Sequence, residues 1–317
     1  MITVLGEALV DRFEGADHPP FERPGGSPAN VAVALARLGV TTRLATQLGD
    51  DERGRMVLRH LRQNGVAVAP GSMRGGRPTS VARTVVTNGQ AEYDFSVTWE
   101  ELPVTAQLTL IEGGTNCVHT GSIAALAPLA GQAGTGAGAD SVRRAIVAAR
   151  NRATVTFDPN CRPSIMGALG AVRLRTAALV AVSDVVKASE DDLRWLYADR
   201  SPRAVVSGWL DLGAALVVVT RGAGGSWAAT REVAVAVPAE PIEVIDTVGA
   251  GDSFMAGLLA GLHDRGLLGA EARTGLRRLD ADTLAGLLRI ATQVAAVTCG
   301  RRGADSPTAD ELAASSS

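Results

Sequence analysis

Lysine is nearly absent from this sequence: Lys187 is the single lysine among 31 basic residues, and the others are arginines. The 33 acidic residues balance the basic ones, so neither nucleic acid nor an anionic membrane is an expected partner. A Walker A loop needs Gly-Lys followed by Ser or Thr, and Lys187 precedes Ala188, which excludes that phosphate site. The glycine-rich loop of protein kinases is missing as well. Phosphate must therefore be handled by backbone amides, a metal ion or arginine.

Cysteine and long apolar segments are also scarce. Cys117, Cys161 and Cys299 are odd in number and lack the spacing of metal ligands, which argues against a disulfide framework and a zinc site. The first residues, MITVLGEALVD, lack a basic region followed by a long apolar core, so no secretory leader is expected. The longest uncharged stretch, residues 113–139, is broken by glycine, proline and polar residues. We expect a cytoplasmic protein.

Short apolar runs alternate with helical stretches along most of the 317 residues, of which 46% are hydrophobic. Ser27 is a candidate N-cap of the first helix, with Pro28 at its first helical position. The predicted strands are residues 2–6, 41–46, 116–120, 154–158, 184–187 and 215–220. The predicted helices are residues 31–38, 51–64, 141–152, 173–182, 191–197, 204–211 and 253–262. This alternation predicts an α/β fold with a mostly parallel sheet covered on both faces.

One region breaks this alternation. Residues 80–87 and 90–99 are strand-like, and Asn88-Gly89 between them is a strong signal for a hairpin turn. Together with residues 9–13 they predict a small separate sheet beside the parallel one.

This small sheet would be formed by about residues 9–24 and 76–100, as a discontinuous lid on a single domain that spans residues 1–317. One face of the hairpin carries Tyr93, Phe95, Val97 and Trp99. Because so many large apolar side chains need a cover, this face is expected to pack on the parent domain, over a ligand or against a second subunit.

The polar residues that follow the predicted strands indicate where a ligand binds. In an open α/β sheet, ligands bind beyond the carboxyl ends of the strands. The residues at these positions are Glu7, Asp11, Gly121, Ser122, Asp158, Asn160, Arg162, Lys187, Ser189, Glu190, Thr220, Arg221, Gly222 and Gly224. Their mixed charge and their glycines fit a polyhydroxylated substrate that lies next to a phosphate-bearing one.

The segment DTVGAGD, residues 246–252, is the strongest single signal and precedes an apolar helix. Its small residues Gly249, Ala250 and Gly251 leave the free N–H groups of the helix open to an anion, which the helix dipole also favours. Asp252 is placed to accept a proton from a hydroxyl group that attacks phosphorus. From spacing alone, a glycine-rich turn with a capping aspartate explains the segment equally well.

A second glycine-rich segment, GGSPAN at residues 25–30, also leads into a helix. Gly25 and Gly26 would let backbone amides reach sugar hydroxyls, and the side chain of Asn30 would both donate and accept hydrogen bonds. The simpler interpretation is an ordinary capped helix whose Asn30 faces solvent or caps the turn.

Together these segments resemble the ribokinase-like (phosphofructokinase-B type) family of carbohydrate kinases. The resemblance spans nearly the whole chain and rests on GGSPANVAVALARLG and DTVGAGDSFMAGLLAGL, with LGDDERGRM, FDPNCRPS, VKASEDDL and VVVTRGAGG between them. The segments GEALVD, HTGSIA and FDPNCRP are most similar to bacterial fructokinases. The resemblance implies a Rossmann-type α/β/α sandwich of three layers with a small β-sheet lid.

The resemblance also implies roles for individual residues. Asp252 would be the catalytic base, and the amides of Gly249, Ala250 and Gly251 would hold the transferring phosphoryl group. The substrate-binding residues would be Asp11, Gly25, Gly26, Asn30, Phe95, Ser122 and Arg162. The nucleotide-binding residues would be Lys187, Ser189, Thr220, Gly222 and Gly224.

ATP and Mg²⁺ are the cofactors that the resemblance implies, with K⁺ as a further candidate. The family's Asn-x-x-Glu element matches Ser189-Glu190-Asp191-Asp192 here, so the shorter Asp192 would take the place of the glutamate that organises Mg²⁺. Asp246 and Thr247 would lie at the site of the monovalent cation.

The expected activity is transfer of the γ-phosphoryl group of ATP to a sugar hydroxyl, with fructose as the first choice of acceptor. Arg162 keeps 2-dehydro-3-deoxygluconate open as an alternative, because a guanidinium group suits its carboxylate. Ribose is a further alternative. A homodimer is expected, because the lid hairpin could pair between subunits.

Two rivals belong to other classes. The first is a non-catalytic sugar- or nucleotide-binding protein on the same fold. Such a protein would not need a catalytic base, so the presence of Asp252 counts against it. A Rossmann dehydrogenase is disfavoured, because no complete G-x-G-x-x-G follows the first strand.

Overall fold

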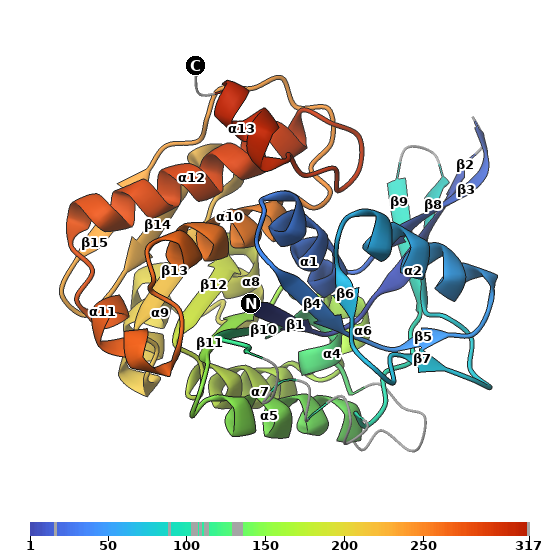
Figure 1. Ribbon diagram of the computed structural model, residues 1–317, viewed down its shortest axis with the longest axis horizontal. Helices are drawn as coiled ribbons and strands as arrows, with labels where there is room; N and C mark the ends of the chain where they lie inside the picture. Colours follow the sequence, from blue (N-terminus) through green and yellow to red (C-terminus); the bar gives the residue numbers. More distant parts are fainter. Residues whose placement is uncertain are drawn as a thin grey trace.

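The computed structural model describes most of the chain. The described residues are 1–15, 18–87, 90–102, 107, 110, 114–128 and 136–315, without the side chains of residues 15, 18, 85–87, 90–93 and 315. A sheet of nine strands forms the centre of this part (Figure 1). Its strands, in spatial order, are β15 (Ala234–Val237), β14 (Ser226–Ala229), β13 (Leu216–Thr220), β12 (Val185–Ser189), β11 (Thr154–Asp158), β10 (Cys117–Gly121), β1 (Ile2–Leu5), β4 (Thr42–Ala45) and β6 (Ala67–Val68).

Seven neighbouring strands of this sheet run parallel, in the spatial order β6, β4, β1, β10, β11, β12 and β13. The strands β14 and β15 are added antiparallel at the β13 edge. The carboxyl ends of the parallel strands therefore meet on one side of the sheet. These ends are Leu5, Gly121, Asp158, Ser189 and Thr220. This side of the sheet is where the sequence predicts the ligands.

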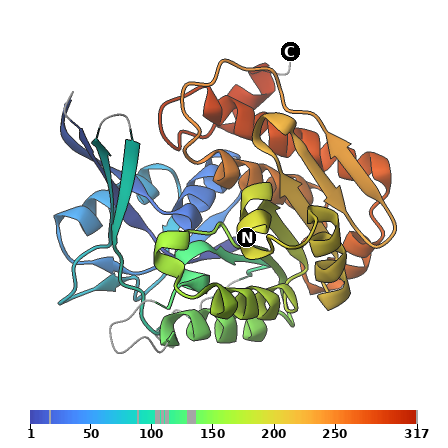
Figure 2. The same ribbon diagram turned by 180° about the vertical axis from the view of Figure 1, so that it is seen from behind.

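Helices cover both faces of the sheet (Figures 1 and 2). One face carries α1 (Ser27–Arg37), α2 (Glu52–Gln63), α10 (Ala250–Asp264) and α12 (Ala281–Cys299). The other face carries α4 (Ser122–Leu126), α5 (Ala137–Ala149), α7 (Leu169–Val180), α8 (Glu190–Leu196) and α9 (Pro202–Leu212). The predicted three-layer α/β sandwich is confirmed, and the ends of the predicted helices differ from the observed ones by up to four residues.

Each face of the sheet has its own hydrophobic core. Along β13, Leu216 and Val218 lie in the core under α10 and α12, whereas Val217 and Val219 lie in the core under α8 and α9. Successive strand residues point to opposite faces, so a strand that is covered twice must be apolar at every position. This explains why the inner strands read as continuous apolar runs.

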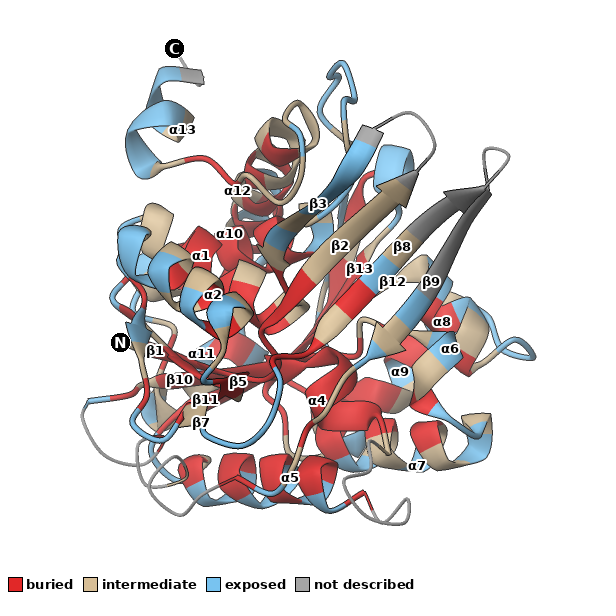
Figure 3. Ribbon diagram, turned by 90° about the vertical axis from the view of Figure 1, so that its right-hand side faces the viewer, coloured by how far each residue is buried: buried red, intermediate tan, exposed pale blue. Residues whose placement is uncertain are grey.

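A second sheet of four strands lies beyond the carboxyl ends of the parallel strands, and is called the lid sheet below (Figure 3). Its strands, in spatial order, are β3 (His18–Gly25), β2 (Leu9–Gly15), β8 (Val81–Thr87) and β9 (Gln90–Ser96). The strand β2 pairs antiparallel with β3 and parallel with β8, and β8 pairs antiparallel with β9. The predicted turn at Asn88-Gly89 lies outside the described residues.

The predicted row of aromatic residues on the lid hairpin is wrong at Trp99. The strand β9 ends at Ser96, and Trp99 is 2% exposed in the core on the α5 face of the central sheet. The close packing is visible at Gly138 of α5, where an added Cβ atom would lie 2.7 Å from the indole ring. Phe95 remains on the lid sheet, and the side chain of Tyr93 is outside the described part.

The predicted N-cap at Ser27 is also wrong. Gly26 occupies the N-cap of α1 with φ of 99°, and no side chain caps this helix. A Cβ atom at Gly26 would lie 2.7 Å from the carbonyl oxygen of Glu7, so the close approach of the two chain segments requires glycine. The hydroxyl group of Ser27 is thus left for a different partner.

The remaining elements are short. They are β5 (Leu48–Gly49), β7 (Met73–Arg74), α6 (Pro163–Met166), α11 (Arg273–Arg277), α13 (Ala309–Ser315) and the 3₁₀ turns η1 (Gly222–Gly224) and η2 (Ala270–Ala272). In the part of the chain that the structure describes, no helix has the length and apolar character needed to cross a bilayer.

Candidate active site

The helix α10 begins at the edge of the sheet where the carboxyl ends of the strands meet. Its N-cap, Gly249, has φ of 75°, and an added Cβ atom would lie 2.4 Å from that of Ala304, so only glycine fits. The amide of Ala250 donates to the carbonyl oxygen of Thr247 at 3.2 Å. The amides of Gly249 and Gly251 have no acceptor within the described residues. Two of the three predicted anion-hole amides are therefore open to a ligand.

Asp252 lies in the first turn of α10 and is 7% exposed. Its Oδ1 accepts a hydrogen bond from the hydroxyl group of Ser27 at 2.7 Å and a longer one from the Asn160 amide at 3.4 Å. Its Oδ2 accepts from the side-chain amide of Asn30 at 2.9 Å. Burial raises the pKa of Asp252, and the bonds from Asn30 and Ser27 oppose this rise.

Two cations lie near this carboxylate, but each is bonded to other groups. The Nζ atom of Lys187 donates to Oδ2 of Asp158 at 2.6 Å, and both side chains are buried. The Nη1 atom of Arg162 donates to the side-chain oxygen of Asn160 at 2.7 Å and to the carbonyl oxygens of Asn160 and Cys161. Within the described part of the chain, Asp252 is thus hydrogen-bonded by neutral side chains alone.

Two non-glycine residues have a positive φ in the described structure, and both lie at this site. Ser122 (φ 55°) follows β10, and Asn160 (φ 36°) follows β11. The amide of Asn160 donates to Oδ1 of Asp158 at 3.1 Å, which fixes the turn. Strained backbone of this kind persists where the surrounding contacts enforce it, and it is concentrated at functional sites.

A cavity of about 510 Å³ lies between the lid sheet and the start of α10. It is called the sugar-side cavity below, after the predicted substrate-binding residues that line it. The predicted site residues that line it are Asp11, Gly26, Asn30, Phe95, Ser122, Arg162, Thr247, Gly249, Gly251 and Asp252. Its ionisable lining residues are Glu7, Asp11, Arg162 and Asp252. The cavity therefore joins residues from both ends of the chain, and acidic groups outnumber basic ones in it.

Asp11 is the acidic residue that the lid sheet contributes to this cavity. Burial raises its pKa to about 6, with the positive charge of Arg162 opposing and the negative charge of Asp252 adding to the shift. Gly25, on the paired strand β3, does not line the cavity but makes room for Asp11, because a Cβ atom there would overlap the carboxylate.

Glu7 is buried at the floor of the cavity, 2% exposed. Its carboxylate accepts hydrogen bonds from the amides of Ile123 and Ala124, at the start of α4, at 3.3 and 2.9 Å. Burial raises the pKa of Glu7, and these backbone bonds oppose the rise. Glu7 thus anchors the turn that contains Ser122.

A second cavity, of about 490 Å³, lies on the other side of the start of α10. It is called the nucleotide-side cavity below, after the two predicted nucleotide-binding residues that line it. Thr220 and Gly222 line it, whereas Lys187, Ser189 and Gly224 are not among its described lining residues. Most of its wall is apolar and comes from α12 and from Ala239, Pro241, Ile242 and Val244. Thr247 and Gly251 line both cavities. The open amides at the start of α10 therefore lie where the two cavities meet.

The carboxylate of Asp192 is engaged by the protein itself. Its Oδ2 accepts from the amide and the hydroxyl group of Ser189 at 2.8 and 2.7 Å, and the Asp192 amide donates back to that hydroxyl oxygen, which forms a capping box for α8. Its Oδ1 accepts from the amide of Cys161 at 2.7 Å. These bonds tie the start of α8 to the turn after β11.

Asp246 is held in a similar way beside the start of α10. Its two carboxylate oxygens accept from the amides of Val248 and Gly303, at 3.0 and 2.8 Å. Each oxygen atom keeps a lone pair. No group of three or more His, Cys, Asp or Glu side chains that could hold a metal ion occurs among the described residues.

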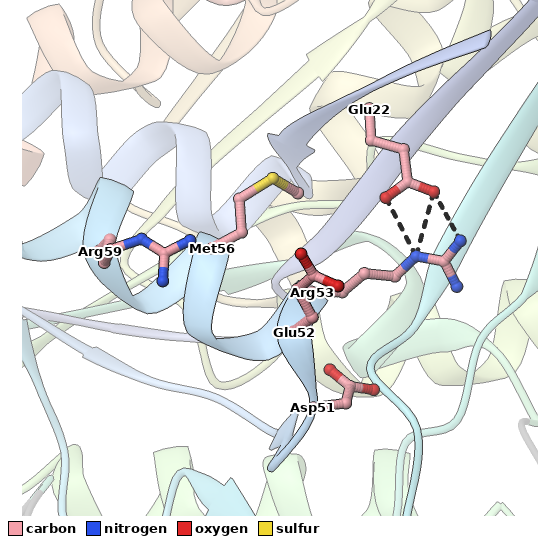
Figure 4. Close-up of a pocket in the computed structure, with 6 residues that line it drawn as sticks. All are labelled: Glu22, Asp51, Glu52, Arg53, Met56 and Arg59. Carbon is pink, nitrogen blue, oxygen red and sulfur yellow. Dashed lines mark hydrogen bonds and ion pairs between the residues drawn. The ribbon is translucent and has the colours of Figure 1, made fainter.

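A shallow hollow of about 390 Å³ lies on the outer side of the lid sheet, between β3 and α2 (Figure 4). Its main feature is an ion pair between Glu22 of β3 and Arg53 of α2, in which the guanidinium group contacts both carboxylate oxygens. The pair connects the lid sheet to the body of the protein. We assign it no ligand.

Ser27 was not predicted as a site residue, whereas Glu7 and Asn160 were predicted only as positions beyond strand ends, without a role. Glu7 and Asn160 follow predicted strands, so their positions at the carboxyl ends were a usable signal. Ser27 had none, because its local pattern indicates a helix cap and its partner Asp252 is 225 positions away.

Comparison with known proteins shows which family the chain belongs to. Residues 18–311 match the model of the pfkB family of carbohydrate kinases. A fructokinase of Rhizobium leguminosarum bv. trifolii is 34% identical over 275 residues, which cover 84% of this chain and 81% of that protein.

Solved structures are similar over nearly the full length. A fructokinase of Xylella fastidiosa with bound ATP has a TM-score of 0.84 at 24% identity, with 99% of this chain and 97% of that chain covered. A fructokinase double mutant of Vibrio cholerae, with fructose, ADP and a potassium ion bound, has a TM-score of 0.76 at 26% identity, with 98% and 94% covered. The family model spans most of the chain, and the chain therefore belongs to the pfkB family of carbohydrate kinases.

Proposed function

We propose that this protein is a fructokinase, which transfers the γ-phosphoryl group of ATP to fructose and forms fructose 6-phosphate. The observation that carries this proposal is the charge of the sugar-side cavity, whose described lining has three acidic residues and one basic residue, Arg162. Carboxylates accept hydrogen bonds from sugar hydroxyls, whereas a sugar acid would meet an excess of negative charge. The similarity to fructokinases supports the same acceptor.

Asp252 is the proposed catalytic base. It accepts the proton of the attacking sugar hydroxyl while the new O–P bond forms and the bond between γ-phosphorus and the bridging oxygen of ATP breaks, so that ADP leaves. The amides of Gly249 and Gly251 donate to the oxygens of the transferring group. Because a sugar hydroxyl is a very weak acid, Asp252 takes its proton late in the reaction.

The sugar is proposed to lie in the sugar-side cavity. Asp11 accepts hydrogen bonds from sugar hydroxyls, and Asn30 both donates and accepts. Gly26 lets the chain approach closely, Phe95 supplies an apolar surface from the lid sheet, and the hydroxyl group of Ser122 lies in the opposite wall. In this proposal the lid sheet covers the sugar and excludes water from the reaction.

ATP is proposed to lie in the nucleotide-side cavity. The apolar wall fits an adenine ring, and Thr220 and Gly222 lie near the phosphates. Lys187, Ser189 and Gly224 do not line that cavity, so we propose that they act by supporting the site. Lys187 does so through Asp158, Ser189 through Asp192, and Gly224 by forming the 3₁₀ turn η1.

Mg²⁺, when bound with ATP, neutralises the charge of the phosphates and usually takes most of its ligands from them and from water. This fits the described part of the chain, in which no group of three or more His, Cys, Asp or Glu side chains is arranged to hold a metal ion. Oδ2 of Asp192 already accepts two hydrogen bonds from Ser189 and Oδ1 accepts one from Cys161, which favours contact of this carboxylate with the ion through water. For K⁺, the fixed carboxylate of Asp246 and the adjacent Thr247 form a suitable donor set, and the related V. cholerae structure holds a potassium ion.

The oligomeric state and the location belong to this proposal too. Among the described strands, β3 and β9 are the two edge strands of the lid sheet, and an edge strand can pair with a second copy of the chain. We propose a homodimer on this ground, and a monomeric mass by light scattering would contradict it. The three cysteines are free thiols, which fits the cytoplasm.

The test is the rate of ADP formation from Mg·ATP in the presence of K⁺, with fructose, ribose, 2-dehydro-3-deoxygluconate and no sugar as parallel assays. We expect the highest kcat/KM with fructose and little turnover without sugar. Preference for the sugar acid would overturn the charge argument and assign Arg162 to its carboxylate. Sugar binding without turnover on any acceptor would favour the non-catalytic alternative.

A further inference from the structure

The contact between Ser27 and Asp252 has no role in forming the helix α1. Ser27 is the first residue of α1, the N-cap is Gly26, and no side chain caps this helix. The hydroxyl group of Ser27 instead donates to Oδ1 of Asp252 at 2.7 Å, across the interface between α1 and α10. This side chain therefore serves the carboxylate and not its own helix.

The hydrogen bonds to Asp252 are distributed unequally between its two oxygens. Oδ1 accepts from Ser27 at 2.7 Å and from Asn160 at 3.4 Å, whereas Oδ2 accepts from Asn30 alone at 2.9 Å. A carboxylate oxygen has two lone pairs. Oδ1 is thus saturated, whereas Oδ2 keeps one lone pair, and Asp252 lines the sugar-side cavity.

The side chain of Asn160 is itself oriented by its neighbours. Its oxygen accepts from Nη1 of Arg162 at 2.7 Å, so its NH₂ group is the end that faces Asp252. Its backbone amide is held by Asp158 at 3.1 Å. The Asn160 donor is therefore fixed in direction, and Ser27 supplies the shorter of the two bonds to Oδ1.

We propose that Ser27 is a positioning residue for the catalytic base: its hydroxyl group, with the Asn160 amide, holds Oδ1 of Asp252 so that Oδ2 receives the proton of the sugar hydroxyl. This inference rests on the proposed function. It names the atom that accepts the proton, and it assigns to Ser27 a role in kcat and not in sugar affinity.

Neutral donors are suited to this task. A hydroxyl or amide group favours the ionised carboxylate without giving it a permanent ion-pair partner, which would weaken it as a base. The charged groups around Asp252 are Lys187 from β12, Arg162 and Asp158 from β11 and its following turn, and Asp11 from β2. These are unchanged when Ser27 is replaced, so the pH dependence of a Ser27 variant reports the lost hydrogen bond.

The experiment compares Ser27→Ala, Ser27→Thr and the unaltered enzyme, with Ser207→Ala on an exposed position of α9 as a matched control. Steady-state kinetics with fructose give kcat and KM, and the acid limb of kcat against pH reports the base in the ternary complex. Thermal melting is measured for each variant. Because Ser27 makes no capping bond, Ser27→Ala is expected to fold.

We expect Ser27→Ala to lower kcat about tenfold at neutral pH, with KM for fructose changed less than twofold. The acid limb of kcat should move up by about one pH unit, because the lost bond favoured the ionised form. Ser27→Thr keeps the hydroxyl group and should restore both kcat and the acid limb. Ser207→Ala should match the unaltered enzyme.

An unchanged acid limb in a folded Ser27→Ala variant would overturn the inference, and so would a rise in kcat or a loss confined to KM. Asp252→Asn, assayed in parallel, separates this result from the proposed function. If Asp252→Asn is inactive while Ser27→Ala has an unchanged profile, the role of Ser27 alone is wrong. If Asp252→Asn retains full turnover, the proposed base is wrong as well.

Discussion

Lys187, the single lysine of the chain, forms a buried ion pair with Asp158, with 2.6 Å between Nζ and Oδ2. The pair joins β12 to β11 below the start of α10, and a Cβ atom added at Gly251 would lie 3.2 Å from Nζ. Burial raises the pKa of Asp158 to about 6, and the charge of Lys187 opposes this rise. The pair therefore connects β11 and β12 beneath the site, and loss of either partner would leave the other charge buried without a counter-ion.

Replacing Lys187 by Met should destabilise the protein by about 3–5 kcal/mol at pH 8, because Asp158 is left buried without its partner. The pKa of Asp158 would then rise above about 6, so its protonation would recover much of this loss at pH 5. Urea unfolding at both pH values measures the effect. The double variant Lys187→Met/Asp158→Asn removes both charges of the pair, so its free energy of unfolding should vary less with pH than that of Lys187→Met. Equal losses at both pH values would contradict this account.

Asp252→Asn should lower kcat by about a hundred- to ten-thousandfold, because the amide cannot accept the proton of the sugar hydroxyl. The affinity for fructose should change little, since Asp11 and Asn30 still contact the sugar. Coupled ADP release measures the first quantity and calorimetric titration with fructose the second. Loss of sugar binding together with turnover would mean that Asp252 serves chiefly to bind.

Asp11→Asn should weaken fructose binding and raise the melting temperature of the unliganded protein by about 2–4 °C at neutral pH. The pKa of Asp11 is raised from 3.8 to about 6 on folding, so its contribution to stability is lost as pH rises through this interval. An uncharged asparagine avoids that loss. Differential scanning calorimetry with and without fructose separates the two effects, and a lower melting temperature would show that Asp11 is stabilising.

The same shift predicts the pH dependence of sugar binding. Below about pH 6, Asp11 is protonated and accepts hydrogen bonds from sugar hydroxyls less well, so KM for fructose should rise. The Asp11→Asn variant provides the control, because its KM should be nearly flat between pH 5 and pH 8. A rise of equal size in that variant would assign the titration to another group.

Gly249→Ala should destabilise the protein by about 2–4 kcal/mol. The left-handed backbone at Gly249 strains any other residue, and the new methyl group would lie 2.4 Å from the Cβ atom of Ala304. Gly39→Ala is a useful comparison, since Gly39 also has a positive φ (82°) but has open space around it. Chemical unfolding should show a clearly smaller loss at Gly39, and equal losses would remove the steric part of the argument.

The inner strands of the central sheet and the helices between them were predictable because each element carries its own local pattern, whereas β14, β15 and α12 were not predicted. The continuous apolar run of β13, for example, indicates a strand covered on both faces, and both cores are present. Trp99 shows where such local reasoning fails. Alternation placed it on the lid hairpin, but β9 ends at Ser96 and the indole ring is buried against α5, a contact that local pattern does not encode.

Within the site, the sequence by itself determined which glycines and which carboxylate begin α10, because a left-handed N-cap and free helix amides depend on residues that are adjacent in the chain. It also placed Asp11 and Arg162 near the carboxyl ends of the strands and Asn30 at the start of a helix, and all three line the sugar-side cavity. The tertiary structure decided how Asp252 is held. Its hydrogen bonds come from Ser27, Asn30 and Asn160, on segments up to 225 positions away, and only the packing of α1 against α10 and the turn after β11 brings these groups within bonding distance.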